Sequence, residues 1–198
     1  EAGAKHSYDL VAGDVKEAEQ IAREEEQHEA ELIASFDEEL LKYTGSIVLG
    51  INDALVELTG ALAGLTLALR DPKLIALTGS ITGIAAAMSM AASEYLSTKS
   101  EDTEKHPIKA AVFTGIAYIV TVVLLIAPYL MQLNVYLSLG IMIGVALAII
   151  FVFNFYISVA QDLNFKKRFL EMAILSLFVA SFSFGVGYLF NHFFNVDA

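Results

Sequence analysis

The chain has 198 residues, of which 56% are hydrophobic, and its mean hydropathy is +0.60. An ordinary water-soluble domain is excluded, because much of the apolar content falls in long uninterrupted runs. The sequence has no cysteine, which excludes disulfide bonds, thiolate metal sites and a cysteine nucleophile. It also lacks the basic face that nucleic-acid binding requires, so we expect no nucleic-acid partner.

The net charge of −11 is unevenly distributed along the chain. Residues 1–41 hold thirteen acidic residues against three basic ones, a net charge of −10, whereas the rest of the chain is nearly neutral. This division predicts two domains, an acidic cytoplasmic helical hairpin at 1–43 and a membrane domain at 44–198.

The acidic part has the pattern of two helices. Residues 1–12 favour a short helix, and Gly13-Asp14 favours a turn after it. From Val15 to about Tyr43 the apolar residues again recur with helical spacing, and we expect this second helix to run on toward the membrane. The sequence begins at Glu1, without a methionine and without a signal-peptide pattern. We therefore expect the chain to be partial at this end.

Five apolar runs follow, and each is longer than the about 20 residues that a helix needs to cross a bilayer. The fold class predicted is therefore all-α, a polytopic membrane protein with five transmembrane helices in contact with lipid. The predicted spans are residues 45–69, 74–97, 109–131, 135–160 and 169–194.

The basic residues predict the orientation of these spans. Only Arg70 and Lys73 lie at one membrane face. Because cytoplasmic loops carry the excess of Lys and Arg, we expect the N-terminus inside and the C-terminus outside. The basic residues of the predicted cytoplasmic face are Lys42, Lys99, Lys105, Lys109, Lys166, Lys167 and Arg168.

The first span carries two acidic residues, Asp53 and Glu57, four positions apart on one helical face. A charge at mid-bilayer costs about 2.5–3.5 kcal/mol on the insertion scale. Insertion of the Leu, Ile and Val residues of the span contributes only about 3–6 kcal/mol, which barely offsets the cost of two buried acids. These acids therefore need cations, protons or water inside the bundle. We interpret the span as an ion-handling helix. The alternatives are a buried proton-sharing pair and an acid paired with Asn154 of the fourth span.

The second span places Met90 and Glu94 on one face near its predicted cytoplasmic end. At a rise of about 1.5 Å per residue, Met90 lies at the depth of Asp53, with Glu94 below and Glu57 above. Carboxylates attract a divalent cation, and a thioether favours transition metals over Mg²⁺ or Ca²⁺. The alternative for Met90 is filling a gap in a packed bundle.

Small and hydroxylated residues of the spans have simpler interpretations. Gly60, Gly64, Gly79 and Gly83 predict close helix packing. Interhelical hydrogen bonds are expected from Thr114, Tyr118, Thr121 and Ser176.

Two motifs, INDALVELTGALAG at residues 51–64 and SMAASEYLSTKSE at residues 89–101, resemble the vacuolar iron transporter family. The resemblance implies a homodimer in a prokaryotic cell membrane that moves Fe²⁺, and Mn²⁺ as well, out of the cytosol in exchange for protons. It implies that Asp53 and Met90 line the ion pathway. An odd number of spans also favours a dimer over two internal halves. Two features depart from the family: Thr82 stands where a plant member has an acid, and the plant-type metal-binding insert is absent.

The acidic hairpin contains Glu25-x-x-His28, which places two metal-ligand types on one helical face. With Glu1, this pattern resembles the last two helices of a ferritin-like, rubrerythrin-type domain. The resemblance implies that Glu1, Glu25 and His28 are ligands of a di-iron site that residues outside this chain complete. The alternative is a solvated acidic face.

We therefore predict a transporter of divalent transition metal ions rather than an enzyme. The ion pathway is predicted to use Asp53, Glu57, Met90 and Glu94. A membrane-anchored di-iron ferroxidase and a proton or monovalent-cation carrier are the alternatives.

Overall fold

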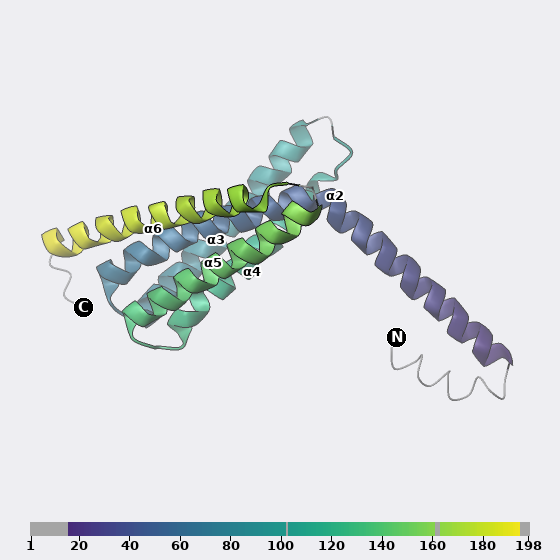
Figure 1. The fold of residues 1–198 in the computed structure, drawn as a ribbon, viewed down its shortest axis with the longest axis horizontal. Coiled ribbons are helices and arrows are strands. Elements are labelled where there is room, and N and C mark those ends of the chain that lie inside the picture. The colour runs from purple at the N-terminus through teal and green to yellow at the C-terminus, as the bar shows by residue number, and fades with distance from the viewer. Residues whose placement is uncertain (1–15, 102, 161–162, 195–198) are drawn as a thin grey trace. The chain divides into compact units, whose positions relative to one another are not determined.

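The computed structural model describes the backbone of residues 16–101, 103–160 and 163–194, and the side chains of residues 41–101, 103–159 and 163–193. Every regular element in these ranges is a helix. The predicted helix at 1–12 and the turn at Gly13-Asp14 lie outside the described residues. The helices are α2 (Lys16–Leu69), α3 (Pro72–Ser100), α4 (Pro107–Leu130), α5 (Val135–Ala160) and α6 (Phe165–Phe194) (Figure 1).

All five helices contain a segment long and apolar enough to cross a membrane, which confirms the predicted fold class. These segments are Leu41–Leu69, Pro72–Ser100, Pro107–Leu130, Val135–Val159 and Phe165–Phe193.

Three of the helices, α3, α4 and α6, begin earlier than their apolar runs predicted, and polar side chains cap two of them. The Asp71 side chain accepts hydrogen bonds from the backbone amides of Lys73 at 2.7 Å and Leu74 at 3.1 Å, and Pro72 occupies the first helical turn. Asn164 caps α6 in the same way, accepting from the amide of Lys167 at 3.2 Å. Capping satisfies backbone donors that would otherwise lack partners, so the helix extends past the apolar run.

Helix α2 is continuous over 54 residues, so the prediction that the acidic helix runs on into the first span is confirmed. The chain divides into two compact units, Glu1–Thr44 and Gly45–Ala198. The second unit contains the membrane helices.

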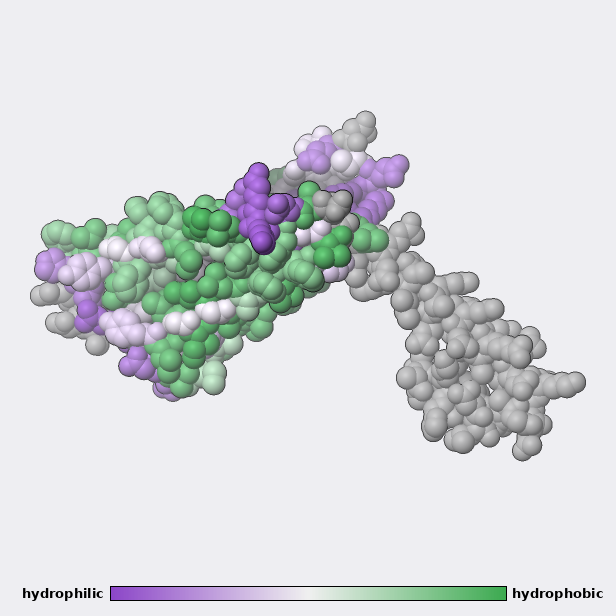
Figure 2. All heavy atoms as spheres, viewed as in Figure 1, coloured by the Kyte–Doolittle hydropathy of each residue, from purple (hydrophilic) through white to green (hydrophobic). Residues whose placement is uncertain are grey.

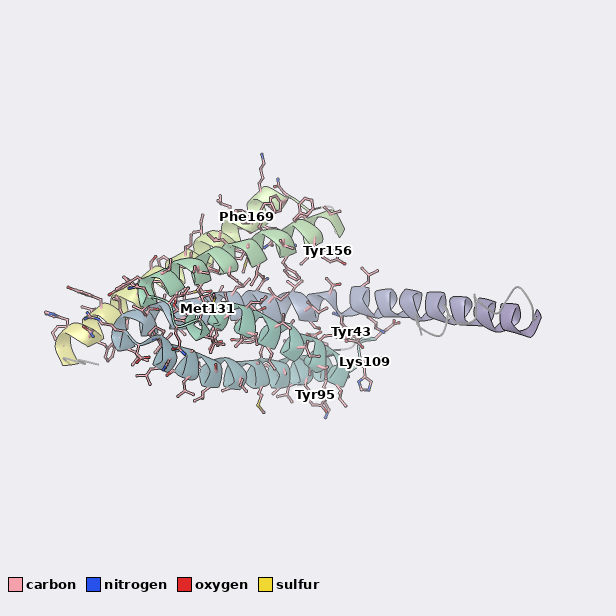
Figure 3. The ribbon with its side chains drawn as sticks, turned by 90° about the horizontal axis from the view of Figure 1, so that it is seen from below. Tyr43, Tyr95, Lys109, Met131, Tyr156 and Phe169 are labelled. Carbon is pink, nitrogen blue, oxygen red and sulfur yellow. The ribbon has the colours of Figure 1, made fainter. Side chains whose placement is uncertain are left out.

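Short connections join the helices in an up-and-down order. Figure 3 shows Tyr95 and Lys109 at one end of the helices and Met131 toward the other. Two of the turns are sharp: Arg70 and Gln132 have φ angles of 52° and 53°. They adopt the left-handed conformation that commonly ends a helix, although neither is glycine. The chain therefore returns directly from α2 into α3 and from α4 into α5.

The core lies where α2, α3, α4 and α5 meet, around fully buried side chains such as Leu58, Tyr118, Leu125 and Met142. Glycines bring the helices close together, as expected for membrane proteins. A Cβ atom added at Gly187 of α6 would collide with the carbonyl oxygen of Gly64 in α2. One at Gly83 of α3 would lie 2.6 Å from a methyl carbon of Val122 in α4. The predicted packing role of these small residues is therefore confirmed.

The outer surface of the helices is strongly apolar. Hydrophobic side chains cover most of the visible face of the bundle in Figure 2. Large side chains such as Val152, Phe178 and Phe182 are each 66% exposed. Exposure of this extent fits contact with hydrocarbon and not with water.

The predicted interhelical hydrogen bonds are confirmed for two of the four residues. Thr114 donates to the carbonyl oxygen of Ser46 at 3.0 Å, and Tyr118 donates to Glu57 at 2.9 Å. The prediction is wrong for Thr121, which donates to the carbonyl of Ala117 in its own helix at 2.9 Å. A helical Thr can always reach the carbonyl four residues back, which competes with a neighbouring helix. The Ser176 hydroxyl is buried and has no partner among the described residues.

Candidate ion-binding site

A hollow of about 520 Å³ lies between α2 and α3, and it contains three of the four residues predicted for the ion pathway. Asp53 and Glu57 line it from α2, and Met90 lines it from α3. The remaining lining residues also come from α3: Ile81, Thr82, Ala85, Ala86, Ser89 and Ser93.

Local sequence explains why a hollow forms here. The lining positions of α3 recur at intervals of three and four residues, so they form one continuous helical face. Ala85, Ala86 and Ser89 occupy the middle of that face and have small side chains. Space therefore remains in front of the longer Asp53 and Glu57 side chains, and most polar atoms in this space belong to acceptors. An arrangement of this kind can hold a cation with some of its water.

A third helix, α4, holds Glu57. The hydroxyl of Tyr118 in α4 donates a 2.9 Å hydrogen bond to its carboxylate, and the Tyr118 side chain is fully buried. Asn154, the alternative partner considered from sequence, instead donates to the carbonyl of Ile150 in its own helix at 2.8 Å.

Glu94 follows Ser93, which lines the hollow, but Glu94 does not line it. Its carboxylate accepts a 2.6 Å hydrogen bond from the hydroxyl of Ser46 in α2, and Ser46 is buried. The carbonyl of Ser46 accepts from Thr114, so this point joins α2, α3 and α4. Ser46 cannot be recognised from the sequence, because a lone serine in an apolar run carries no pattern.

Asp53 also lines a second cavity of about 400 Å³, between α2 and α6. Asn52 and Val56 of α2 and Met172 and Leu175 of α6 are among its lining residues. The side-chain oxygen of Asn52 is buried and has no hydrogen-bond partner among the described residues. Neither Asn52 nor Met172 was predicted from sequence.

A groove of about 520 Å³ adjoins the hollow on the side of Gly60 and Gly64. Thr82 lines both spaces, and α6 contributes Ser183 and Phe190. Most of this groove is apolar, and its polar side chains are those of Thr78, Thr82 and Ser183.

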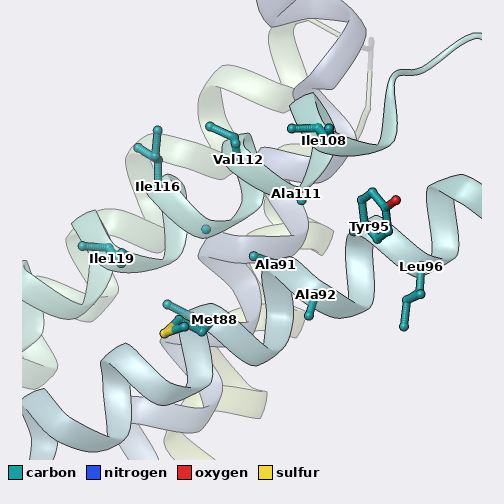
Figure 4. Close-up of a pocket in the computed structure, with 12 residues that line it drawn as sticks. Met88, Ala91, Ala92, Tyr95, Leu96, Ile108, Ala111, Val112, Ile116 and Ile119 are labelled. Atoms are coloured by element: carbon teal, nitrogen blue, oxygen red, sulfur yellow. The ribbon is translucent and has the colours of Figure 1, made fainter.

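A larger space lies elsewhere, between α3 and α4 (Figure 4). This groove of about 610 Å³ is lined almost entirely by apolar residues, among them Met88 and Ile116, which are 69% and 58% exposed. It contains none of the predicted pathway residues, and its composition suits contact with lipid chains.

The predicted N-terminal ligands Glu1, Glu25 and His28 lie outside the described side chains. Within the described residues, no group of three or more His, Asp or Glu side chains is close enough to hold a metal ion.

Residues 44–106 match the model of the VIT family. The matched segment includes the membrane part of α2, all of α3 and the loop after it, and therefore Asp53, Glu57, Met90 and Glu94. The VIT match supports the resemblance to vacuolar iron transporters and indicates transport of metal ions across a membrane. It does not reach the acidic hairpin at 1–43. No curated protein matches the chain.

Proposed function

We propose that this protein exports Fe²⁺ and Mn²⁺ from the cytosol in exchange for protons, and that the hollow between α2 and α3 is its ion-binding site. The observation that carries the proposal is that Asp53, Glu57 and Met90 line one space within the segment that matches the VIT family.

The ligand types in the hollow favour a transition metal. Two carboxylates balance the charge of a divalent cation, and the thioether of Met90 is a soft ligand that Mg²⁺ and Ca²⁺ do not prefer. Ser89, Ser93 and Thr82 add hydroxyl oxygens to the same space. A carboxylate that releases a metal can take up a proton, so the same side chains support exchange of the ion for protons.

The proposed route begins at the acidic hairpin, whose negative charge would concentrate cations at the cytoplasmic face. The ion then passes Glu94, binds at Asp53 and Met90, and leaves past Glu57. Ser46 holds the carboxylate of Glu94 beside the hollow and not in it. Glu94 therefore acts at the entrance, and Asp53 provides the first charge inside.

A second copy of the chain is proposed to close the hollow. Ile81 lines this space and is 63% exposed, so in a single chain the hollow opens onto the lipid-facing surface. A carboxylate facing hydrocarbon costs about 2.5–3.5 kcal/mol, which a polar space enclosed by two subunits would avoid. We therefore propose a homodimer whose interface covers Asp53 and Glu57.

Proteoliposomes test the proposed function directly. Purified full-length protein would be reconstituted, Fe²⁺ (kept reduced) or Mn²⁺ added, and metal entry and internal pH followed with two dyes. We expect Asp53→Asn to abolish metal flux and the coupled proton flux, and Met90→Leu to reduce metal flux strongly.

Two control variants keep the test specific. Met142→Leu removes a fully buried thioether that lines none of the cavities described above, and Glu171→Gln removes a carboxylate on the surface of α6. Both should transport normally. Normal Fe²⁺ and Mn²⁺ flux in Asp53→Asn would reject the proposal.

The di-iron ferroxidase considered from sequence stays a prediction. Its ligands Glu1, Glu25 and His28 lie outside the described side chains, and no observation on the membrane helices favours it.

A further inference from the structure

Asp53 lies between two separate cavities, and each of them contains a methionine. The α3-side hollow has Met90, and the α6-side cavity has Met172. The first belongs to the proposed function. The second has no role in it, although it shares the acidic residue on which that function depends.

Asn52 gives the α6-side cavity an unused ligand. Its side-chain oxygen can only accept, and it is buried without a donor among the described residues. Leaving a buried polar atom unpaired costs about 1–3 kcal/mol, so such atoms in folded proteins usually bind a water molecule or an ion. The carboxylate of the adjacent Asp53 makes this environment negative, which favours a cation over an anion.

Met172 completes a mixed set of ligands. It reaches the cavity from α6 and is partly buried against the core. The other lining residues, Gly45, Val48, Leu49, Val56 and Leu175, have no polar side-chain atom. The cavity therefore offers one amide oxygen, one carboxylate and one thioether within about 400 Å³. At roughly 30 Å³ per water molecule, this volume admits a partly hydrated ion.

We propose that the α6-side cavity is a second binding site for the divalent transition metal ion, with Asn52, Asp53 and Met172 as its ligands. This proposal rests on the proposed function. The cavity reaches Gly45 and Val48, at the end of the span predicted to be cytoplasmic, and the hollow reaches the same end at Ser93, next to Glu94. The α6-side cavity therefore gives the ion a second entry beside the one at Glu94, and Asp53 transfers an ion from this cavity across α2 to Met90. Because both sites need the same carboxylate, one ion at a time is bound there.

Mn²⁺ binding to the purified full-length protein tests this site. The concentration of free Mn²⁺ would be followed by electron paramagnetic resonance during titration of the wild type, Asn52→Ala, Met172→Leu, Met90→Leu, Asp53→Asn and the control Met142→Leu. Because one ion occupies either site, Asn52→Ala and Met172→Leu are compared in the Met90→Leu background, where we expect each to weaken the remaining Mn²⁺ binding by about tenfold, the lower end of the loss seen when residues supporting a metal site are removed. Met142→Leu should bind like the wild type.

The variants separate this proposal from the proposed function. If Asp53→Asn loses affinity while Asn52→Ala and Met172→Leu leave the Mn²⁺ binding of the Met90→Leu protein unchanged, the α6-side cavity holds water only. The second site would then be overturned and the proposed function would stand. If Asp53→Asn binds Mn²⁺ normally, both proposals fail.

A labelling experiment covers the case in which Asn52→Ala or Met172→Leu does not fold. The chain has no cysteine, so Met172→Cys introduces a single thiol. Mn²⁺ should slow maleimide labelling of this thiol, and should leave labelling unchanged at Lys167→Cys, an exposed position in the first turn of α6. Equal labelling of Met172→Cys with and without Mn²⁺ would overturn the second site.

Discussion

The hydroxyl of Tyr118 donates a 2.9 Å hydrogen bond to the carboxylate of Glu57, joining α4 to the acidic face of α2. Hydrogen bonds to charged groups contribute about 1.5–3 kcal/mol, and Tyr118 is fully buried, so water does not replace it easily. Tyr118 therefore fixes the direction of a carboxylate that lines the hollow.

Tyr118→Phe removes this donor and keeps the ring that packs in the core. We expect Fe²⁺ and Mn²⁺ flux to fall by roughly tenfold or more, in line with the free energy of a hydrogen bond to a charged group. Proteoliposome flux measures this. Tyr129→Phe is the matched control, because the Tyr129 hydroxyl interacts with Thr66 at 2.8 Å and not with an acid. Equal losses in both variants would show that the effect comes from packing alone.

The carboxylate of Glu57 in α2 can be moved to position 82 of α3, because Glu57 and Thr82 line the hollow from opposite helices. We expect Glu57→Gln to lose most metal flux and the double variant Glu57→Gln/Thr82→Glu to regain part of it. Adding Ser80→Glu instead should not restore flux, since Ser80 does not line the hollow and donates to Ala76. Recovery with Ser80→Glu would mean that only net charge matters.

Ser46 and Glu94 form a 2.6 Å hydrogen bond, and their coupling can be measured with a double-mutant cycle. We expect Ser46→Ala and Glu94→Gln each to lower the free energy of unfolding in mixed micelles. The double variant should lose less than the sum of the two, by about 1.5–3 kcal/mol, because the second change finds the bond already broken. Strictly additive losses would contradict the contact.

Gly187→Ala tests the close approach of α6 to α2. Its new methyl group would meet the carbonyl oxygen of Gly64, so we expect a loss of about 1–3 kcal/mol from overpacking and a lower melting temperature. Gly140→Ala and Gly144→Ala are matched controls, because nothing lies within 4 Å of the added atom at either position. They should be neutral or slightly stabilising, since alanine favours a helix over glycine by up to about 1 kcal/mol. A stable Gly187→Ala protein would place α6 further from α2.

The proposed dimer can be tested by crosslinking, because the natural chain has no cysteine. We expect Ile81→Cys in native membranes to form a covalent dimer with a short bifunctional maleimide. Val152→Cys, which is equally exposed on α5, should remain monomeric under the same conditions. The same crosslinking yield at both positions would indicate random collision and contradict an interface over the hollow.

Several features could be predicted from the sequence because they depend on local spacing. Apolar run length located the five spans, and the four-residue separation of Asp53 and Glu57 placed them on one face of α2. The depth of Met90 follows from the rise per residue along α3, and the structure places Met90 in the same hollow as Asp53.

Other features depend on how each helix is rotated about its own axis, which the sequence of that helix does not determine. Tyr118, Thr114 and Thr121 gave the same prediction from sequence, yet only the first two reach another helix. Likewise, no sequence pattern relates Met172 to Asp53, because the two residues are more than 100 positions apart in the chain. The sequence by itself determined which residues share a face, because helical periodicity is local. Only the tertiary structure decided which faces meet, because that depends on side-chain packing between helices far apart in the sequence.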